Sequence, residues 1–232
     1  MDVAKLKKEA AYQAVQNEVR SGMKLGLGTG STVAHALDAL AEALHERGSI
    51  RDIVGVPTSE WTTKRATELG IPLTTLDQVD ALDVTIDGAD EIDPTLNLIK
   101  GLGGALLREK MIAQATKHFV IIADERKLVQ RLGQKSPLPV EVVPFGWNAH
   151  LPFLNRAGAN VIRRVSNEQP YVTDNNNYIL DCHFDKLSGI SDPKGFDWQL
   201  LCRAGIVDHG LFLNMAAIAY VATQNGVVIL KR

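Results

Sequence analysis

The side chains best suited to chemistry are concentrated in two neighbouring stretches, Asp87–Asp93 and Lys100–Lys110. The first contains four acidic residues, and the second opens with a lysine and a glycine-rich turn before a helical pattern. Both follow Leu82–Ile86, an apolar run with the length of a strand. Carboxylates placed where a strand ends, next to a lysine and a turn that opens a helix, are typical of the crevice in which α/β proteins hold ligands. We therefore predict that these stretches form the active site.

Glu109 is the candidate general base of this site. It is expected about a turn and a half inside a helix that begins near Gly104, where its carboxylate faces the crevice. Such a glutamate can move a proton, while Lys100 and backbone N–H groups stabilise an enediolate oxygen and a bound phosphate anchors the substrate. This combination suits proton transfer on a carbon next to a carbonyl. It predicts an aldose-ketose isomerase that uses no cofactor.

The acidic stretch has two other interpretations. Some of its carboxylates, Asp87, Asp90, Glu91 and Asp93, are expected to be simply solvated in a loop. Together they could also hold Mg²⁺ or Ca²⁺, but their spacing is not that of an EF-hand and Lys100 would compete for the same negative charge. We expect no metal.

A glycine loop, Gly28-Thr29-Gly30-Ser31-Thr32, follows the apolar run Met23–Leu27 and precedes a helical pattern. It is not a G-x-G-x-x-G dinucleotide loop, and no Gly-Lys-Ser/Thr follows as in a Walker loop. The alternatives are a structural turn and a cradle for a single phosphate. The hydroxyl groups at the start of the helix favour the cradle, because a helix N-terminus favours an anion.

The elements that must position these residues alternate between strands and helices. A first helix is expected after a capping Asp2. Later strands are expected at Asp52–Val56, Ile71–Leu76 and Phe119–Ala123, with a helix at Glu60–Leu69 between the first two of them. This alternation predicts a parallel sheet covered on both faces.

The composition changes at Ser136-Pro-Leu-Pro139, which suggests a domain boundary. Beyond it the patterns follow the order βαββαβ of a small ferredoxin-like unit, ending with a strand at Ile206–Phe212. Asn225-Gly226 then predicts a hairpin that returns to the first sheet. The expected fold is α/β: a Rossmann-like parallel-sheet domain (1–134 and 210–232) with an inserted smaller ferredoxin-like α+β domain (135–209) that acts as a lid or an oligomer interface.

Composition sets limits on the partners. A net charge of −2 and 22% charged residues give no basic footprint for nucleic acid, and no apolar run is long enough to cross a membrane. With no signal-peptide pattern at the N-terminus, we expect a soluble, cytoplasmic protein. Cys182 and Cys202 lie in apolar sequence and are expected to be reduced structural thiols.

Four motifs in register resemble the type A ribose-5-phosphate isomerases. They are Gly28-Thr-Gly-Ser-Thr32, Asp87-Gly-Ala-Asp-Glu-Ile92, Lys100-Gly-x-Gly-Gly-Ala-Leu-x-Arg-Glu-Lys110 and Pro137-Leu-Pro-Val-Glu-Val142. The resemblance covers nearly the whole chain. It implies interconversion of ribose 5-phosphate and ribulose 5-phosphate in the non-oxidative pentose phosphate pathway, with no metal or organic cofactor, by a homodimer or homotetramer.

The resemblance also implies individual roles. Glu109 would transfer the proton, Asp87 and Asp90 would open the sugar ring and orient the substrate, and Lys100 would stabilise the oxyanion. Many bacterial members have glycine at the position of Leu102, so we expect this leucine to keep its N–H group and add bulk beside the sugar. The substrate-binding residues that the resemblance implies are Thr29, Gly30, Ser31, Thr32, Asp87, Gly88, Ala89, Asp90, Lys100, Gly101, Leu102, Gly103, Lys127 and Lys7.

Two other classes of protein remain as alternatives. Amino-sugar phosphate deaminases and CoA transferases share this general fold by resemblance. A deaminase needs a catalytic histidine near the acidic loop, whereas the nearest one, His118, lies beyond the Glu109 helix. A sugar-phosphate-sensing domain of a transcriptional regulator would bring a helix-turn-helix, for which there is no room before Gly26.

Overall fold

The computed structural model describes residues 3–46 and 48–232. Asp2, the expected cap of the first helix, lies outside these residues. No helix within them is long and apolar enough to cross a membrane. The chain divides into two compact units: residues 1–89, 108–127 and 215–232 form one, and residues 90–107 and 128–214 form the other. The second unit therefore contains more of the chain than the 135–209 segment expected from the sequence, because residues 90–107, 128–134 and 210–214 belong to it.

The first unit is built on a six-stranded sheet in the order β15-β14-β6-β3-β1-β2. The strands are β1 (Lys24–Leu27), β2 (Val54–Pro57), β3 (Leu82–Gly88), β6 (Thr116–Asp124), β14 (Ile218–Thr223) and β15 (Gly226–Lys231). All neighbours pair in parallel except β14 and β15. The predicted parallel sheet is thus confirmed.

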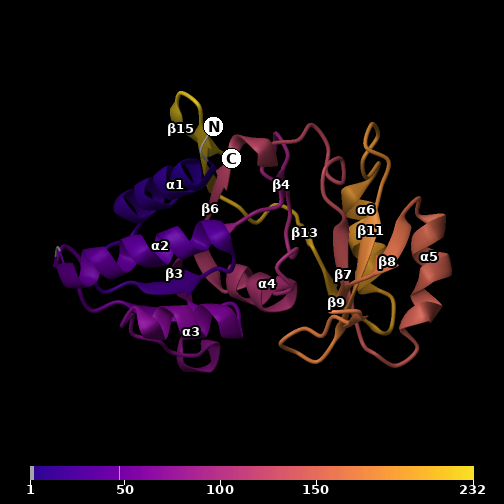
Figure 1. The fold of residues 1–232 in the computed structure, drawn as a ribbon, viewed down its shortest axis with the longest axis horizontal. Helices are drawn as coiled ribbons and strands as arrows, with labels where there is room; N and C mark the ends of the chain where they lie inside the picture. The colour runs from indigo at the N-terminus through magenta and orange to yellow at the C-terminus, as the bar shows by residue number, and fades with distance from the viewer. Residues whose placement is uncertain (1–2, 47) are drawn as a thin grey trace. The chain divides into compact units, whose positions relative to one another are not determined.

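Helices cover both faces of this sheet. They are α1 (Val3–Glu18), α2 (Ser31–Ala41), α3 (Glu60–Glu68) and α4 (Leu106–Gln114), with short turns at η1 (Glu42–Glu46), η2 (Leu76–Gln78) and η3 (Glu125–Lys127). Figure 1 shows α2 and α3 on opposite sides of β3. The apolar residues of α2 recur at helical spacing, and Val33, Leu37 and Leu40 are all buried in the larger core. A smaller cluster joins Ile112 of α4 to Val56 and Leu82 of the sheet.

The C-terminal hairpin returns to the first sheet as predicted, since β14 pairs in parallel with β6. Its loop lies one residue earlier than expected. Thr223 pairs with Gly226, so the loop is Gln224–Asn225 and Gly226 is the first residue of β15.

The prediction of a strand at Ile71–Leu76 was wrong. Leu73 forms only an isolated bridge with Gly55, and the chain enters the 3-10 turn η2 at Leu76. Pro72 accounts for part of this difference, because a proline has no N–H group to donate to a strand ladder.

The second unit contains a four-stranded antiparallel sheet in the order β12-β7-β11-β8. Its strands are β7 (Leu138–Val142), β8 (Asn160–Arg163), β11 (Tyr178–His183) and β12 (Ile206–His209). The remaining elements are η4 (Trp147–His150), α5 (Leu151–Arg156), α6 (Pro193–Leu201) and the small hairpin of β9 (Val165–Ser166) and β10 (Gln169–Pro170). The chain order is βαββαβ, as expected for a ferredoxin-like unit.

A small antiparallel sheet also belongs to the second unit. It consists of β4 (Glu91–Ile92), β5 (Leu98–Ile99) and β13 (Leu211–Phe212), in the order β13-β5-β4. The single strand expected at Ile206–Phe212 is therefore two strands in different sheets. This small sheet leads directly into Lys100, so it positions the start of the glycine-rich turn.

Candidate active site

The order of the six-stranded sheet marks a candidate site at the carboxyl ends of β1 and β3. The chain proceeds from β1 to β2 on one side and continues with β3 on the other, so the direction of winding changes between β1 and β3. In open α/β sheets, ligands bind at such a switch point. The glycine loop follows β1 and the acidic stretch follows β3, so both predicted motifs lie where this rule places a ligand.

Asp87 is fully buried near the end of β3. Its Oδ1 accepts hydrogen bonds from the backbone N–H groups of Thr29, at 3.1 Å, and Gly88, at 2.7 Å. A side chain at Gly28 is excluded, because an added Cβ would lie 2.1 Å from the same Oδ1. The carboxylate is therefore fixed against the glycine loop, and Thr29, Gly88 and Asp87 lie together.

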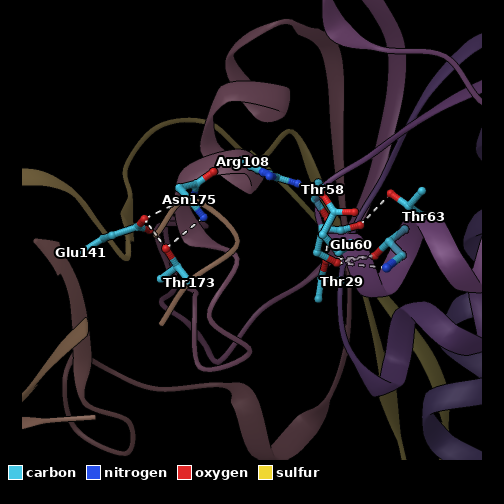
Figure 2. A network of polar contacts seen from close by, with 10 residues as sticks. Thr29, Thr58, Glu60, Thr63, Arg108, Glu141, Thr173 and Asn175 are labelled. Carbon is cyan, nitrogen blue, oxygen red and sulfur yellow. Dashed lines mark hydrogen bonds and ion pairs between the residues drawn. The ribbon is translucent and has the colours of Figure 1, made fainter. Parts of the chain in front are cut away.

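The hydroxyl group of Thr29 is directed into the protein. Its Oγ1 lies 2.7 Å from Thr58 Oγ1, 2.7 Å from Ser59 Oγ and 3.0 Å from Thr62 Oγ1 (Figure 2). Thr62 in turn donates to the carbonyl oxygen of Gly28 at 2.7 Å. This network of hydroxyl groups fixes the shape of the glycine loop. The hydroxyl group of Thr29 therefore stabilises the glycine loop.

The N-terminus of α2 has the features of a phosphate cradle. Gly30 is the N-cap residue and no side chain caps the helix. Ser31 is exposed, Thr32 is half-buried, and the Nζ atom of Lys7 donates to Ser31 Oγ at 2.8 Å. An uncapped helix N-terminus with a lysine and a hydroxyl group beside it favours an anion. Lys7, Gly30, Ser31 and Thr32 therefore meet within the first unit.

Glu109 lies in the first turn of α4 and is only 5% exposed. The helix begins two residues later than predicted, so Glu109 is closer to the N-terminus than a turn and a half. Ile112 of α4 packs on the sheet, and a residue three positions earlier lies on the same side of a helix. Because α4 leads into β6, which is parallel to β3, its N-terminus is at the carboxyl end of the sheet. Glu109 is therefore on the sheet-facing side of α4, at the end of the sheet that carries Asp87.

Arg108, which precedes Glu109 in the sequence, connects α4 to α3. The guanidinium group of Arg108 donates to Glu60 of α3 at 2.7 Å (Figure 2). This contact links the two helices of the first unit next to Glu109.

Lys127 ends the 3-10 turn η3 after β6 and is half-buried. The turn is organised by Asp124, which accepts hydrogen bonds from Arg126 Nε at 2.7 Å and from Arg126 Nη2 at 3.0 Å. These bonds from Arg126 hold the pKa of the Asp124 carboxyl below its ordinary value. Asp124 was not among the predicted site residues, although its position at the end of a strand resembles that of Asp87.

In the second unit, Asp90 and the glycine-rich turn are connected directly. Asp90 Oδ2 accepts a hydrogen bond of 3.0 Å from the backbone N–H of Leu102, whose side chain is 40% exposed. The N–H group of Leu102, which the leucine was expected to keep, therefore donates to Asp90. Gly101 and Gly103 flank this contact in the same turn, and Ala89, which is buried, precedes Asp90.

Two of the four acidic residues, Glu91 and Asp93, have structural roles and are not simply solvated. Glu91 is fully buried, and its carboxylate accepts backbone N–H bonds of 2.5 to 2.6 Å from Gly133, Lys135 and Ser136. Asp93 accepts bonds from Thr95 and Asn97 and closes the turn between β4 and β5. The sequence did not reveal these roles, because the donors to Glu91 come from a loop more than forty positions away.

Lys100 is 2% exposed, which is unusual for a lysine. Its N–H group donates to the carbonyl oxygen of Gly210 at 2.9 Å, and its Nζ atom lies 5.5 Å from the centre of the Phe212 ring. The segment that contains β13 thus holds the backbone of this lysine and places an aromatic ring near its ammonium group.

A second buried carboxylate of the second unit was also missed. Glu141 of β7 is fully buried, and its Oε1 accepts hydrogen bonds from Thr173, Asn175 and Asn177 (Figure 2). The motif around Glu141 was part of the resemblance, but nothing in its spacing indicates that a turn thirty residues later would surround it. Within the residues that the structure describes, no group of three or more His, Cys, Asp or Glu side chains is arranged to hold a metal ion.

Comparisons with known proteins agree with this geometry. Residues 54–226 match the family described as ribose 5-phosphate isomerase A (phosphoriboisomerase A). The chain is 52% identical to a protein named ribose-5-phosphate isomerase A from Chloroflexus aurantiacus, over 95% of this chain and 91% of that protein. It is 44% identical to the protein of the same name from Pyrococcus abyssi over the full length of both.

Solved structures give the same result. A D-ribose-5-phosphate isomerase in complex with phospho-erythronic acid is similar at a TM-score of 0.95 and 44% identity, over 100% of both chains. The ribose 5-phosphate isomerase of Plasmodium falciparum is similar at a TM-score of 0.95 and 41% identity, over 99% of both chains.

Proposed function

Because this chain belongs to the ribose 5-phosphate isomerase A family and is an isomerase, we propose that it interconverts ribose 5-phosphate and ribulose 5-phosphate through an enediolate. The reaction serves the non-oxidative pentose phosphate pathway. The observation that carries the mechanism is the burial of two carboxylates, Asp87 and Glu109, at one end of the sheet in the first unit.

Glu109 is the proton-transferring base in this proposal. Its carboxylate removes the proton from C2 of the open-chain aldose, and the electron pair of that bond forms the C1–C2 double bond while negative charge develops on O1. The same carboxyl group returns the proton to C1, and the proton of the C2 hydroxyl passes to O1, so C2 becomes the carbonyl carbon of the ketose. General base catalysis of this kind contributes about 10²- to 10⁴-fold.

Lys100 stabilises the negative charge on O1, since an ammonium group held in a buried position interacts strongly with a developing oxyanion. Asp87 and Asp90 open the sugar ring and orient its hydroxyl groups. The backbone N–H bonds of Thr29 and Gly88 to Asp87 support this role, because they fix the carboxylate before substrate binds.

The phosphate is bound at the N-terminus of α2 by Gly30, Ser31 and Thr32, with Lys7 and Lys127 supplying positive charge. The remaining contacts to the sugar come from Gly88, Ala89, Gly101, Leu102 and Gly103. The structure of a related D-ribose-5-phosphate isomerase was solved in complex with phospho-erythronic acid, a phosphorylated sugar acid. This complex supports a site for a phosphorylated sugar in the present chain. The carboxylate of such an acid is planar and negatively charged, as an enediolate is.

The test is the conversion of ribose 5-phosphate to ribulose 5-phosphate in the presence of EDTA, for the wild type, Glu109→Gln and Glu60→Gln. Glu60 is the matched control, because it lies on α3 and contacts Arg108, next to Glu109 in sequence. We expect wild-type activity to survive chelation, Glu109→Gln to lower kcat by at least about 100-fold, and Glu60→Gln to change it little. Loss of wild-type activity in EDTA would show that a metal is required and overturn the mechanism.

The oligomeric state of the protein and the role of residues 135–209 are also proposed. We expect a homodimer or homotetramer, with residues 135–209 as a lid or as part of the interface. Light scattering on the intact chain and on a chain lacking Pro139–Val207 distinguishes these roles, because retained oligomerisation would rule out the interface.

A further inference from the structure

Arg164, which follows β8 in the second unit, contacts the glycine-rich turn. Its Nη1 atom donates to the carbonyl oxygen of Gly101 at 3.1 Å and to that of Leu102 at 3.0 Å. Gly101 and Leu102 lie more than sixty positions earlier in the chain. One guanidinium group therefore holds two consecutive peptide carbonyls of a turn that the proposed function assigns to the substrate site.

The guanidinium group is itself fixed by Asp181 of β11. Arg164 Nη2 lies 2.6 Å from Asp181 Oδ1, and Nε lies 2.9 Å from Oδ2, which makes the pair bidentate. The side chains are only 13% and 15% exposed. Bidentate pairs of this kind are strong and directional, so Arg164 presents its Nη1 amino group in a fixed direction.

Tyr171 adds a third contact to the same turn. Its hydroxyl group lies 3.5 Å from the carbonyl oxygen of Gly103, and its ring centre is 5.7 Å from the guanidinium carbon of Arg164. An added Cβ at Gly104, where φ is +83°, would lie 2.0 Å from the same hydroxyl oxygen. The turn is thus shaped to fit against Arg164 and Tyr171.

Holding the carbonyls determines where the N–H groups point. A peptide unit is planar and trans, so its C=O and N–H groups point in opposite directions. When Arg164 holds the carbonyl of Gly101, the N–H of Leu102 points away from the guanidinium, and that N–H is the donor to Asp90 at 3.0 Å. Holding the carbonyl of Leu102 directs the N–H of Gly103 away from Arg164 in the same way.

We propose that Arg164 is a positioning residue: fixed by Asp181, it sets the peptide orientations of Gly101–Gly103 and thereby the place of the Asp90 carboxylate. The inference rests on the proposed function for its effect on catalysis, whereas its structural part stands on the contacts within the second unit.

The experiment compares Arg164→Ala, Arg164→Lys and the control Arg163→Ala. Arg163 is the adjacent residue, and its guanidinium group stacks on Trp147 and Tyr178 instead of contacting the turn. Two quantities are measured for each variant: the hydrogen-exchange rate of the Leu102 amide, followed by NMR, and kcat and KM for ribose 5-phosphate. The midpoint of thermal unfolding is recorded separately.

For Arg164→Ala we expect Leu102 exchange to be about tenfold faster or more and kcat to fall about 10- to 100-fold, because small misplacements of catalytic groups have effects of this size. Arg164→Lys keeps the positive charge on a single donor nitrogen but loses the fork that pairs with Asp181, so it should recover part of both losses. Arg163→Ala should leave both quantities within about twofold of the wild type, whatever its unfolding midpoint, because it leaves the contacts of Arg164 in place.

Unchanged Leu102 exchange and kcat in Arg164→Ala, with only a lower unfolding midpoint, would overturn the inference. If the wild type lacked isomerase activity, the proposed function would fail by itself. Leu102 exchange would then still decide the positioning role: faster exchange in Arg164→Ala supports it, and unchanged exchange contradicts it.

Discussion

The carboxylate of Asp90 accepts a hydrogen bond of 3.0 Å from the backbone N–H of Leu102, twelve positions later in the chain. This bond connects the acidic loop after β3 to the glycine-rich turn after β5. It gives a residue assigned to substrate binding a second task, since Asp90 also stabilises the turn beside it.

Asp90→Asn and Asp90→Ala are expected to separate these tasks. The amide oxygen of asparagine can still accept the Leu102 N–H, whereas alanine removes the acceptor. Because asparagine is neutral, the bond it keeps contributes about 0.5 to 1.5 kcal/mol, so we expect Asp90→Ala to lower kcat/KM up to about tenfold more than Asp90→Asn. Steady-state kinetics of the two variants check this result. Equal losses would mean that the contact with Leu102 does not matter for activity.

Glu91→Gln is expected to destabilise the protein strongly. The side chain is fully buried and each of its three acceptor contacts is a backbone N–H, so an amide NH2 group would face donors and leave at least one of them unsatisfied. We expect a loss of about 2 to 3 kcal/mol in the free energy of unfolding, measured by urea unfolding. Glu68→Gln, which removes an exposed pair with Arg65, should cost less than about 1 kcal/mol. Similar losses for both variants would contradict the structural role of Glu91.

Asp124 predicts a specific pH dependence of stability. Its hydrogen bonds from Arg126 lower the pKa of the carboxyl in the folded state below the ordinary value of 3.8. The unfolded state therefore binds more protons in the window between the two pKa values, and the stabilisation is present above 3.8 and is lost as the pH falls through the folded-state pKa. Asp124→Asn should be less stable than the wild type at neutral pH, with a difference that shrinks in acid.

The thermal unfolding midpoints of both proteins, measured from neutral pH down to about pH 3, check this prediction. Asp77→Asn, which removes an exposed carboxylate, is the control and should run parallel to the wild type. A gap between wild type and Asp124→Asn that is constant with pH would contradict the assignment.

The two cysteines should differ in reactivity. Cys182 is fully buried in β11, where burial raises the pKa of the thiol, while Cys202 is exposed at the end of α6. Because the thiolate is the reactive form, a disulfide reagent should modify one thiol rapidly in the native protein and the second only after unfolding. Cys202→Ser should abolish the rapid phase, and a rapid phase that persists in this variant would contradict the structure.

The sequence identified the parts of the site that are local in the chain. Asp87 at the end of a strand, Glu109 at the start of a helix and the glycine loop after β1 all follow from strand and helix patterns within a few residues. The parallel sheet and the βαββαβ order follow from the same patterns. Cys202, expected in an apolar setting, is exposed because it is the C-cap residue of α6.

The partners of the site residues depend on contacts far apart in the chain, and no local pattern encodes them. The donors to Glu91 come from residues 133–136, and the hydrogen bond from Arg164 to the carbonyl oxygen of Gly101 joins residues 63 positions apart. The wrong prediction of a strand at Ile71–Leu76 has the same origin. This segment pairs with Gly55 through an isolated bridge at Leu73 and does not form a strand ladder. The pattern of apolar residues predicts which side chains are buried. Which strands pair through backbone hydrogen bonds depends on packing between residues far apart in the chain.

Proton transfer by Glu109 between C2 and C1 can be followed by NMR of the isomerisation in D2O. A proton that passes through a carboxyl group exchanges with solvent, so we expect deuterium on carbon in the wild-type product. We also expect Glu109→Gln to lower both isomerisation and deuterium incorporation by at least about 100-fold, with its fold retained. Isomerisation by the Glu109→Gln variant at close to the wild-type rate would contradict this role of Glu109.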